Sequence, residues 1–420
     1  MIIHAPDNHS VKCTVELPSS KSISNRLLIM QHLCGRDFNI KNLSDAGDTK
    51  LLMTLLCEIK KSQGSTEPVL LDCANAGTVF RFLTAVLSIT PGNWVITGSG
   101  RMKQRPVGVL AEALHQLGGR LLYLEQPGFP PLSITGTRTF RGGTVHLPGN
   151  ISSQFISALM MIAPCLQGGL ELDLEGDVVS EPYINMTADL MVRCGVAVQK
   201  TGNLIKINEG AYSLPGSGIQ VEPDWSSAAF WYEIAALSAN ADIDLPGLKA
   251  PGIQGDSAVE EIFSHLGVKT LHEAGGIRLV KSNFNDIKPF NYDFSSCPDL
   301  AQAVAVTCAG LNISAKLSGL SGLIIKETDR LSALCSELSK AGYKVHVENS
   351  SELIIDRQMH SQINEECTIE TYGDHRMAMA FAPLASRIGG IEIIDPEVVA
   401  KSYPGFWNDL EAAGFRLVST

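Results

Sequence analysis

The sequence repeats one pattern six times, and this repetition restricts the fold more than any other feature. In each copy a short strand-like run ends in a turn of polar residues, Gly or Pro, and a helix-like run rich in Ala, Leu, Ile and Met follows. The 420 residues divided among six copies give about 70 residues per repeat. Each repeat is predicted to form a strand, a helix and further strands, with Ser, Asp or Asn near the helix N-cap, which indicates an α/β protein. The six turns contain Lys21, Asn75, Ser152, Asp224, Asp299 and Asp374.

Three copies precede about residue 222 and three follow it, so the sequence predicts two domains. The first domain is expected to span residues 20–222, and the second to combine residues 1–19 with residues 223–420. The chain would then cross between the domains at two hinges. Helix N-termini carry unpaired N–H groups and a partial positive charge, so N-termini that converge on an interdomain cleft would form an anion site.

The chain is acidic, with 33 Lys and Arg against 44 Asp and Glu and a net charge of −11. This balance argues against a nucleic-acid-binding protein, which is normally basic, and against binding to anionic membrane lipid. We therefore expect small-molecule partners, with no nucleic acid and no membrane. An acidic protein that binds an anionic substrate must gather its Lys and Arg residues locally, so clusters of cations are the candidates for its site.

The cysteines, the N-terminus and the hydropathy together predict a cytoplasmic protein. No two of the ten cysteines form a C-x-x-C pair, and their mostly apolar neighbours, as at Cys57 and Cys308, favour buried thiols over a disulfide framework or a zinc site. The first residues, Met-Ile-Ile-His-Ala-Pro-Asp, lack the basic and apolar regions of a signal peptide. No apolar run approaches the roughly 18 residues that a membrane-spanning helix needs.

Three candidate motifs lie early in the chain. Ser20–Arg26 puts two cations beside hydroxyls at a predicted helix start, where N–H groups, hydroxyls and cations can hold phosphate together. The small residues of Asn75–Thr78 let a ligand approach the backbone. Arg101–Arg105 brings three cations into five residues, and Pro106 favours an extended Arg105. A capped helix, a turn and an exposed basic loop are the ordinary alternatives, and spacing alone leaves both interpretations open.

Four further motifs lie later in the chain. Ser152–Gln154 opens a predicted helix with neutral groups that suit sugar hydroxyls, phosphate or a simple N-cap. Lys326–Leu331 and Asp374–Arg376 place cations at helix starts, where the helix dipole does not favour them unless an anion binds. Carboxylates in the first turn, such as Glu327 and Asp329, also have an ordinary role beside the dipole. Lys401–Pro404 carries little weight in isolation.

Taken in order, these motifs resemble the enolpyruvylshikimate-phosphate synthase family, which catalyses the sixth step of the shikimate pathway. The resemblance spans roughly residues 17–405 and rests on the ordered set, since each motif alone is modest evidence. It implies a fold of two domains, each an inside-out α/β barrel of three βαβαββ units, with helix N-termini facing the interdomain cleft. The motifs are Leu-Pro-Ser-Ser-Lys-Ser-Ile-Ser-Asn-Arg, Asn-Ala-Gly-Thr, Arg-Met-Lys-Gln-Arg-Pro, Ser-Ser-Gln-Phe, Lys-Glu-Thr-Asp-Arg-Leu, Gly-Asp-His-Arg-Met-Ala-Met and Lys-Ser-Tyr-Pro.

The resemblance implies a role for each residue at a matching position. Asp299 would orient and deprotonate the attacking hydroxyl, and Glu327 or Lys21 would protonate the methylene carbon, so these three are the expected catalytic residues. Shikimate 3-phosphate would be bound by Lys21, Ser22, Arg26, Ser152, Ser153, Ser180, Tyr183, Asp299 and Lys326. Phosphoenolpyruvate would be bound by Lys21, Asn75, Gly77, Thr78, Arg105, Gln154, Arg330, Arg376 and Lys401.

The implied reaction transfers the enolpyruvyl group of phosphoenolpyruvate to the 5-hydroxyl of shikimate 3-phosphate, by addition and elimination through a tetrahedral intermediate, and releases phosphate. It belongs to the biosynthesis of chorismate and the aromatic amino acids. Several cations are needed because the two polyanions repel each other, and the Arg fork suits carboxylate and phosphate. The reaction requires no metal and no organic cofactor. The resemblance further implies glyphosate as the inhibitor, and we expect a monomer.

Two positions depart from the family pattern. Phe82 follows Arg81 where the family often has Pro, and Gly322 stands where it often has Asn.

Three other kinds of protein are alternatives to this family. The sister enzyme that transfers enolpyruvyl to UDP-N-acetylglucosamine typically has a reactive Cys in the loop that corresponds to residues 98–105, and this loop has none. A non-catalytic anion-binding protein of the same fold would bind both ligands without turnover. An RNA-end-processing enzyme of related fold is disfavoured by the acidic charge.

Overall fold

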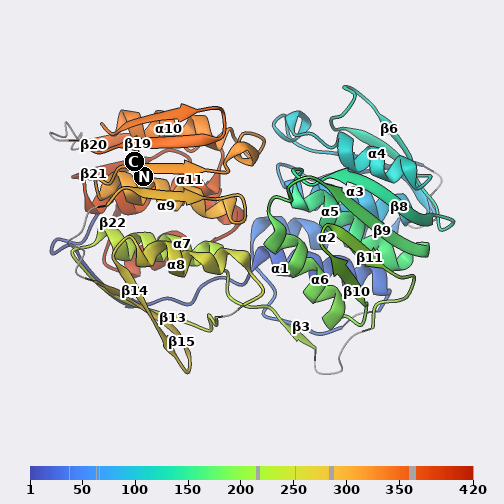
Figure 1. Ribbon diagram of the computed structural model, residues 1–420, viewed down its shortest axis with the longest axis horizontal. Helices are drawn as coiled ribbons and strands as arrows, with labels where there is room; N and C mark the ends of the chain where they lie inside the picture. Colours follow the sequence, from blue (N-terminus) through green and yellow to red (C-terminus); the bar gives the residue numbers. More distant parts are fainter. Residues whose placement is uncertain are drawn as a thin grey trace. The chain divides into compact units, whose positions relative to one another are not determined.

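The computed structural model describes residues 1–36, 38–62, 64–65, 67–213, 218–250, 252–282, 288–358 and 366–419. The chain forms two compact units. The first unit contains residues 20–44 and 48–221, and the second contains residues 1–19, 45–47 and 222–420. Both ends of the chain belong to the second unit, where β1 (Ile2–His4) pairs with β22 (Arg416–Val418), so the two termini lie close together (Figure 1).

The first unit alternates helices and strands. Its helices are α1 (Lys21–Cys34), α2 (Gly47–Lys61, whose first residue belongs to the second unit), α3 (Gly77–Ile89), α4 (Gly108–Gln116), α5 (Ser153–Ile162) and α6 (Glu181–Arg193). Its strands are β3 (Ile40–Lys41), β4 (Val69–Asp72), β5 (Gly92–Thr97), β6 (Arg120–Tyr123), β7 (Leu132–Gly136), β8 (Arg141–Pro148), β9 (Gln167–Glu175), β10 (Val198–Thr201), β11 (Leu204–Ile207) and β12 (Ile219–Gln220).

The second unit alternates in the same way. Its helices are α7 (Trp225–Leu237), α8 (Val259–Ser264), α9 (Ala301–Gly310), α10 (Arg330–Lys340), α11 (His375–Phe381) and α12 (Phe406–Ala412). Besides β1 and β22, its strands are β2 (Ser10–Thr14), β13 (Asn240–Pro246), β14 (Val268–Glu273), β15 (Gly276–Lys281), β16 (Phe290–Asp293), β17 (Ala315–Ser318), β18 (Lys344–Glu348), β19 (Glu352–Asp356), β20 (Glu366–Ile369) and β21 (Gly390–Ile393).

Five four-stranded sheets in the described part of the chain share one order of strand directions, a parallel pair followed by two antiparallel strands, although their connections differ. In the sheet β4-β5-β7-β6, the first two strands are parallel and flank α3, and a hairpin adds the last two strands antiparallel. The sheets β8-β9-β11-β10, β2-β13-β15-β14, β16-β17-β19-β18 and β20-β21-β1-β22 follow the same order. The predicted α/β class with repeated units is confirmed. In the sixth repeat only the parallel pair β12 and β3 is formed among the described residues.

The strand that precedes the first helix of each unit in the sequence belongs to the other unit. The strand that precedes α1 is β2, and it pairs with β13 of the second unit. The strand that precedes α7 is β12, and it pairs with β3 of the first unit. The two crossings of the chain lie side by side, because Ser19 bridges Pro223 and the Asp224 amide donates to the Pro18 carbonyl at 2.9 Å. The sequence repeats grouped each of these runs with the helix that follows it, whereas the predicted domain bounds placed residues 1–19 with the second half of the chain.

In each unit, the helices that follow the first strands of the repeats form the core. Helices α1, α3 and α5 contact one another, as do α7, α9 and α11, whose ribbons lie side by side in Figure 1. Almost every residue of α7 is buried, because Ala, aromatic and branched side chains surround its axis. Strand β13, by contrast, alternates buried and more accessible residues, as a strand on the outside of a helical core should.

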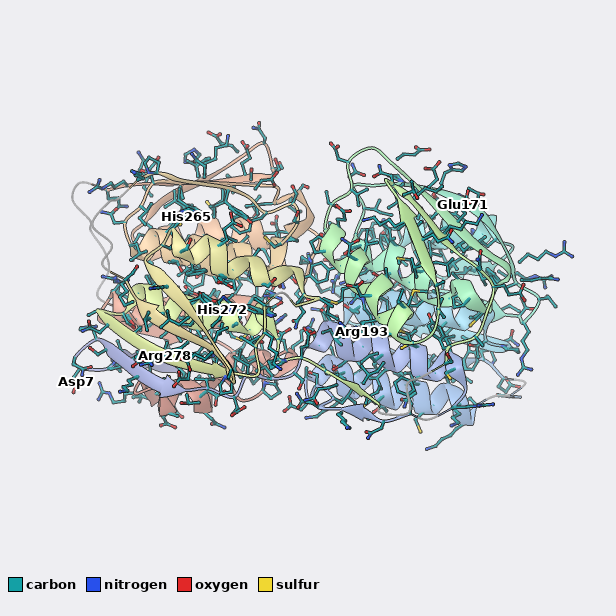
Figure 2. The ribbon with its side chains drawn as sticks, turned by 60° about the horizontal axis from the view of Figure 1, so that its bottom comes forward. Asp7, Glu171, Arg193, His265, His272 and Arg278 are labelled. Carbon is teal, nitrogen blue, oxygen red and sulfur yellow. The ribbon has the colours of Figure 1, made fainter. Side chains whose placement is uncertain are left out.

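Polar contacts tie the outer sheet of the second unit together. Arg278 on β15 donates to the Asp242 carboxylate on β13 through two nitrogens, at 2.6 and 2.7 Å. His272 on β14 lies 2.7 Å from Glu260 on α8, so this sheet is also attached to a helix; His272 and Arg278 are labelled in Figure 2.

The expectation that Cys57 is a buried thiol is wrong. Cys57 is exposed, since it lies on the polar face of α2.

Among the described helices, none combines the length and hydrophobicity that crossing a membrane would require. Within the same residues, no group of three or more His, Cys, Asp or Glu side chains is arranged to hold a metal ion.

Candidate functional site

The candidate residues of the first unit lie at helix starts. Lys21 is the first residue of α1, and its Nζ lies 3.2 Å from Oδ2 of Asp48, the second residue of α2. The carboxylate offsets a cation that the positive end of α1 does not favour. Ser20, the N-cap of α1, makes no capping bond through its side chain, so the first amides of the helix are not capped by it. Ser22 follows Lys21 on the same turn.

Arg26 connects three helices. Its guanidinium donates to Thr187 Oγ1 at 2.7 Å, to Ser157 Oγ at 3.1 Å and to the Tyr183 carbonyl at 3.4 Å. All of these acceptors are neutral, and burial lowers the pKa of Arg26 to about 10. A buried cation with neutral partners is stabilised by an anion that comes within reach, so Arg26 retains the capacity expected of a phosphate ligand.

Phe82 gives the first departure from the family pattern a structural role. The Arg26 guanidinium lies 5.4 Å from the centre of the Phe82 ring, within the range of a cation–π contact. Phe82 is fully buried, and α3 continues without interruption from Gly77 to Ile89. At the second departure, Gly322 is exposed, and a β-carbon there would meet nothing within 4 Å.

Arg105 lies against the start of α3. It is buried, and its Nη1 donates to the Asn75 carbonyl at 3.1 Å. Pro106 predicted an extended Arg105, and the residue has φ −90° and ψ 125°. The other two cations of this basic loop are more accessible, and Lys103 Nζ lies 2.6 Å from Glu125 Oε1. Lys103 therefore behaves as a residue of an accessible basic loop, whereas Arg105 is packed inside the first unit.

Gln154 connects the starts of α3 and α5. Its Nε2 donates to Thr78 Oγ1 at 3.0 Å, and its Oε1 accepts from Arg81 Nη1 at 2.6 Å. Ser152 is the N-cap of α5 and accepts from the Gln154 amide at 3.4 Å, and the buried Ser153 is the first residue of that helix. Sequence reasoning missed Arg81, whose only signal is a charged residue within an otherwise apolar helical run.

Ser180 and Tyr183 lie at the start of α6. Ser180 is the N-cap and has a left-handed backbone with φ 54°, which is uncommon for a residue other than Gly. Its side chain makes no capping bond. Because the Tyr183 carbonyl accepts from both Arg26 and Thr187, Tyr183 belongs to the same network as Arg26.

The second unit contains a buried carboxylate surrounded by cations. Asp299 Oδ1 lies 3.4 Å from Lys326 Nζ and 3.1 Å from Arg330 Nη1, and its Oδ2 lies 3.1 Å from Arg376 Nη2. Burial alone would raise the pKa of Asp299, but Arg376, Lys326 and Arg330 together outweigh it and hold the pKa well below its ordinary value. In this state Asp299 acts as a counter-ion and is a weak base.

Glu327 is the second carboxylate of this cluster. Its Oε2 accepts from Arg330 Nη2 at 3.0 Å, and its Oε1 lies 3.0 Å from Lys401 Nζ. Lys401 ends the short 3₁₀ helix Pro396–Lys401, so the Lys-Ser-Tyr-Pro motif, weak by itself, carries a residue of the cluster. Asp329 has the ordinary role, because it caps α10 by accepting from the Ser332 amide at 3.1 Å.

Asp374 completes the cluster, and sequence reasoning had not assigned it a role there. It caps α11 by accepting from the Arg376 amide at 2.9 Å, and it accepts from Arg330 Nε at 2.7 Å and Nη2 at 3.2 Å. The cluster therefore joins four cations to three carboxylates, namely Lys326, Arg330, Arg376 and Lys401 with Asp299, Glu327 and Asp374.

A further buried acid, Asp256, lies close enough to this cluster for the charges of Asp299 and Arg376 to affect its pKa. It accepts a hydrogen bond from Ser226 Oγ near the start of α7. Burial, followed by the charge of Asp299, raises the pKa of Asp256 to about 6, while Arg376 opposes the rise. No sequence signal distinguished this residue or Asp48, since a carboxylate at a helix start has an ordinary capping interpretation.

Comparison with known proteins identifies the family. Residues 7–410 match the family model described as EPSP synthase (3-phosphoshikimate 1-carboxyvinyltransferase). The chain belongs to the EPSP synthase family. It is 46% identical over 419 residues to the 3-phosphoshikimate 1-carboxyvinyltransferase of Bacteroides fragilis strain YCH46, covering 99% of this chain and 98% of the relative. It is 34% identical over 432 residues to the protein of that name from Methanoculleus marisnigri, covering 99% of this chain and 100% of the relative.

Solved structures agree with the fold. The EPSP synthase of Acinetobacter baumannii superposes with a TM-score of 0.76, covering 100% of this chain and 99% of that chain at 23% identity. The predicted family, fold class and type of enzyme are confirmed, and the sister enzyme that acts on a UDP-sugar is not favoured.

Proposed function

We propose that the chain transfers the enolpyruvyl group of phosphoenolpyruvate to the 5-hydroxyl of shikimate 3-phosphate and releases phosphate. The observation that carries this proposal is the pairing of Asp299 and Glu327 through Arg330, which keeps two candidate proton-transfer groups among the cations that the substrates need. Membership of the EPSP synthase family supports the same reaction.

We assign the two substrates to the residues expected from the sequence. The cations Arg105, Arg330, Arg376 and Lys401 suit the carboxylate and phosphate of phosphoenolpyruvate, because the Arg fork binds two oxygens at once. The hydroxyls and amides at the starts of α1, α5 and α6, with Arg26 beside them, suit shikimate 3-phosphate. Lys21 is assigned to both substrates, and Lys326 to shikimate 3-phosphate.

The cation cluster supports a specific order of events. In the structure, Arg330 and Arg376 are partners of Asp299 and hold its pKa down. The anionic groups of phosphoenolpyruvate would compete for both cations and would add negative charge nearby. Both changes raise the pKa of Asp299, so this carboxylate becomes a useful base when the donor substrate is bound.

The chemical reaction consists of an addition step followed by an elimination step. The hydroxyl oxygen of shikimate 3-phosphate bonds to the central carbon of phosphoenolpyruvate while its proton passes to Asp299. The methylene carbon gains a proton from Glu327, with Lys21 as the alternative donor. Elimination reverses this proton transfer: the new methyl group returns a proton, the bond to the phosphate oxygen breaks, and the leaving phosphate takes up the proton held by Asp299. Placed acid–base groups contribute about 10²–10⁴-fold to such a step, and positioning and electrostatics contribute the rest.

The wider predictions from the sequence are proposals of the same kind. We propose that the two compact units are the two domains, with hinges at the adjacent crossings near Ser19 and Pro223. We also propose that the protein is a monomer, acts in the cytoplasm, and needs no partner besides its two substrates.

Phosphate release from phosphoenolpyruvate tests the reaction, with shikimate 3-phosphate and separately with UDP-N-acetylglucosamine as acceptor. We expect release with shikimate 3-phosphate only, and a loss of about 10²-fold or more in Asp299→Asn and Glu327→Gln. Asp356→Asn, which removes a surface partner of Lys344, is the matched control and should keep full activity. Release with the UDP-sugar alone would identify the sister activity, and binding of both substrates without release would identify a non-catalytic protein.

A further inference from the structure

A buried carboxylate on α10 lies outside the cluster described above. Glu337 is fully buried and lies seven residues after Arg330, so the two side chains share one face of the helix. Lys340 Nζ lies 2.8 Å from Glu337 Oε1 and 3.0 Å from Oε2. The other donors to Glu337 come from the segment Glu370–Asp374, which leads into α11.

That segment is attached to α10 at two points. Near Glu337, the Glu370 amide donates to Oε2 at 3.1 Å and the Tyr372 hydroxyl donates to Oε1 at 2.6 Å. Near Arg330, the Asp374 carboxylate accepts two hydrogen bonds from the guanidinium. The two attachment points on α10 are two helical turns apart, so together they fix both the position and the direction of the segment.

The backbone between the attachment points is one that needs support. Tyr372 has φ 54° and Gly373 has φ 67°, so two successive residues adopt the left-handed conformation. Gly adopts it readily, whereas Tyr does not, and such a conformation persists where surrounding contacts fix it. The hydrogen bond from the Tyr372 hydroxyl to Glu337 is such a contact. The ring is partly exposed, so burial in the core does little to hold the residue.

The segment ends at the residues that would bind phosphoenolpyruvate. Asp374 directs the Arg330 guanidinium and caps α11, and Arg376, two residues further on, donates to the Asp299 carbonyl at 2.9 Å and to its carboxylate at 3.1 Å. A shift of the segment would therefore move the partner of Arg330 and the start of the helix that carries Arg376. Both changes would alter the cations and leave the first unit untouched.

We propose that Glu337 and Tyr372 are positioning residues for phosphoenolpyruvate binding: they hold the segment Glu370–Asp374 on α10 so that Arg330 and Arg376 are aligned for the donor substrate. The inference rests on the proposed function, since it assigns both arginines to phosphoenolpyruvate. Neither positioning residue needs to touch a substrate. The competing interpretation is that the bonds to Glu337 only stabilise the second unit.

Steady-state kinetics of Tyr372→Phe separates the two interpretations, because this variant removes a single hydroxyl. We expect KM for phosphoenolpyruvate to rise roughly tenfold while KM for shikimate 3-phosphate stays within about twofold, as for the loss of one hydrogen bond that orients a ligand group. The matched control is Tyr232→Phe, which also loses one hydroxyl contact in the second unit, to Thr270 at 2.9 Å. Its two KM values should equal those of the wild type.

Glu337 is tested by a graded pair of variants. Glu337→Gln retains an acceptor for the Tyr372 hydroxyl, and Glu337→Ala does not, so KM for phosphoenolpyruvate should rise more in the Ala variant. Hydrogen exchange adds a readout that does not depend on turnover. Amides of residues 370–376 should exchange faster in Tyr372→Phe and in Glu337→Ala than in the wild type or in Tyr232→Phe.

The outcomes are distinguishable. Unchanged KM values in Tyr372→Phe, or equal rises for both substrates, would overturn the positioning role and leave the proposed function intact. A wild-type protein that releases no phosphate would overturn the proposed function and, with it, the assignment to phosphoenolpyruvate. In that case, unchanged exchange of residues 370–376 would also overturn the attachment of this segment, whereas faster exchange would support the attachment alone.

Discussion

Gly77 and Arg105 are packed so closely that no side chain fits between them. A β-carbon built on Gly77 would lie 2.6 Å from Cζ and 2.7 Å from Nη1 of Arg105. Real β-carbons do not approach other atoms this closely, so any substitution of Gly77 must displace the guanidinium. The absence of a side chain at Gly77, the first residue of α3, therefore determines the position of Arg105, one of the residues expected to bind phosphoenolpyruvate.

Gly77→Ala should weaken the binding of phosphoenolpyruvate. Because Arg105 must move from its place beside the Asn75 carbonyl, we expect KM for phosphoenolpyruvate to rise about tenfold or more, with KM for shikimate 3-phosphate nearly unchanged. Initial rates with each substrate varied in turn measure both values. Gly100→Ala is the matched control, since a β-carbon there meets nothing within 4 Å. A Gly77→Ala enzyme with wild-type KM values would contradict the contact.

Asp374→Asn should lower both stability and activity. The substitution leaves the buried Arg330 with two carboxylate partners instead of three and replaces the N-cap of α11. Removing one partner of a buried ion pair costs about 3–5 kcal/mol, and we expect about 3 kcal/mol because Asp299 and Glu327 remain. Urea unfolding measures the change. A loss no greater than that of the surface variant Asp356→Asn would show that the Asp374–Arg330 contact contributes little.

The pH dependence of the reaction should differ between its two kinetic constants. At saturating shikimate 3-phosphate, kcat/KM for phosphoenolpyruvate reports the enzyme before the donor binds, and kcat reports the enzyme with the donor bound. A base is lost as pH falls through its pKa. Since the cations hold the pKa of Asp299 low until phosphoenolpyruvate competes for them, kcat should fall at a higher pH than kcat/KM does.

Rates measured between pH 4 and 8, with the ionisation of phosphoenolpyruvate itself determined separately, test this difference. Acid limbs at the same pH for both constants would mean that Asp299 keeps its cation partners throughout turnover, and the proposed order of events would then be wrong.

Glu233→Gln should stabilise the second unit at neutral pH. Both carboxyl oxygens of Glu233 are buried on α7 without a hydrogen-bond partner, and burial raises the pKa of this group well above its ordinary value of 4.5. The folded state therefore holds a proton that the unfolded chain releases above that value, and the free energy of unfolding falls as pH rises through this range. The amide has nearly the same shape and does not ionise.

Thermal unfolding at pH 5 and pH 7 measures this effect. We expect the gain in Tm of Glu233→Gln over the wild type to be larger at pH 7 than at pH 5, and the exposed control Glu411→Gln to show no such difference. An equal gain at both pH values would indicate that ionisation of Glu233 does not limit stability.

The sequence predicted the repeated helices but gave no prediction of which strands pair. A long run of Ala, Leu and Met with a Ser or Asp at its start identifies a helix from local chemistry alone, as at Ser152, Asp224 and Asp374. The pairing of β2 with β13 joins residues 230 positions apart at Ser10 and Asn240, and nothing local in the sequence encodes it.

The candidate site divides in the same way. Cations at helix starts, such as Arg330 and Arg376, are conspicuous because they oppose the helix dipole, and the sequence singled them out as candidates. Their supporting residues were missed because each has an ordinary local interpretation: Asp374 as an N-cap, Glu337 as a helical glutamate and Tyr372 as a loop residue. Only the fold shows that Asp374 and Tyr372 meet α10 on the face that carries Arg330 and Glu337.

The pairing of strands far apart in the sequence also bears on how the chain is made. During synthesis β2 leaves the ribosome before its partner Asn240–Pro246, and β1 leaves before β21 and β22. The first unit completes its last parallel pair only when Ile219–Gln220 emerges. The second unit therefore cannot close until Arg416–Val418 has been made, so β1 and β2 must wait for their partners while the ribosome synthesises the first unit.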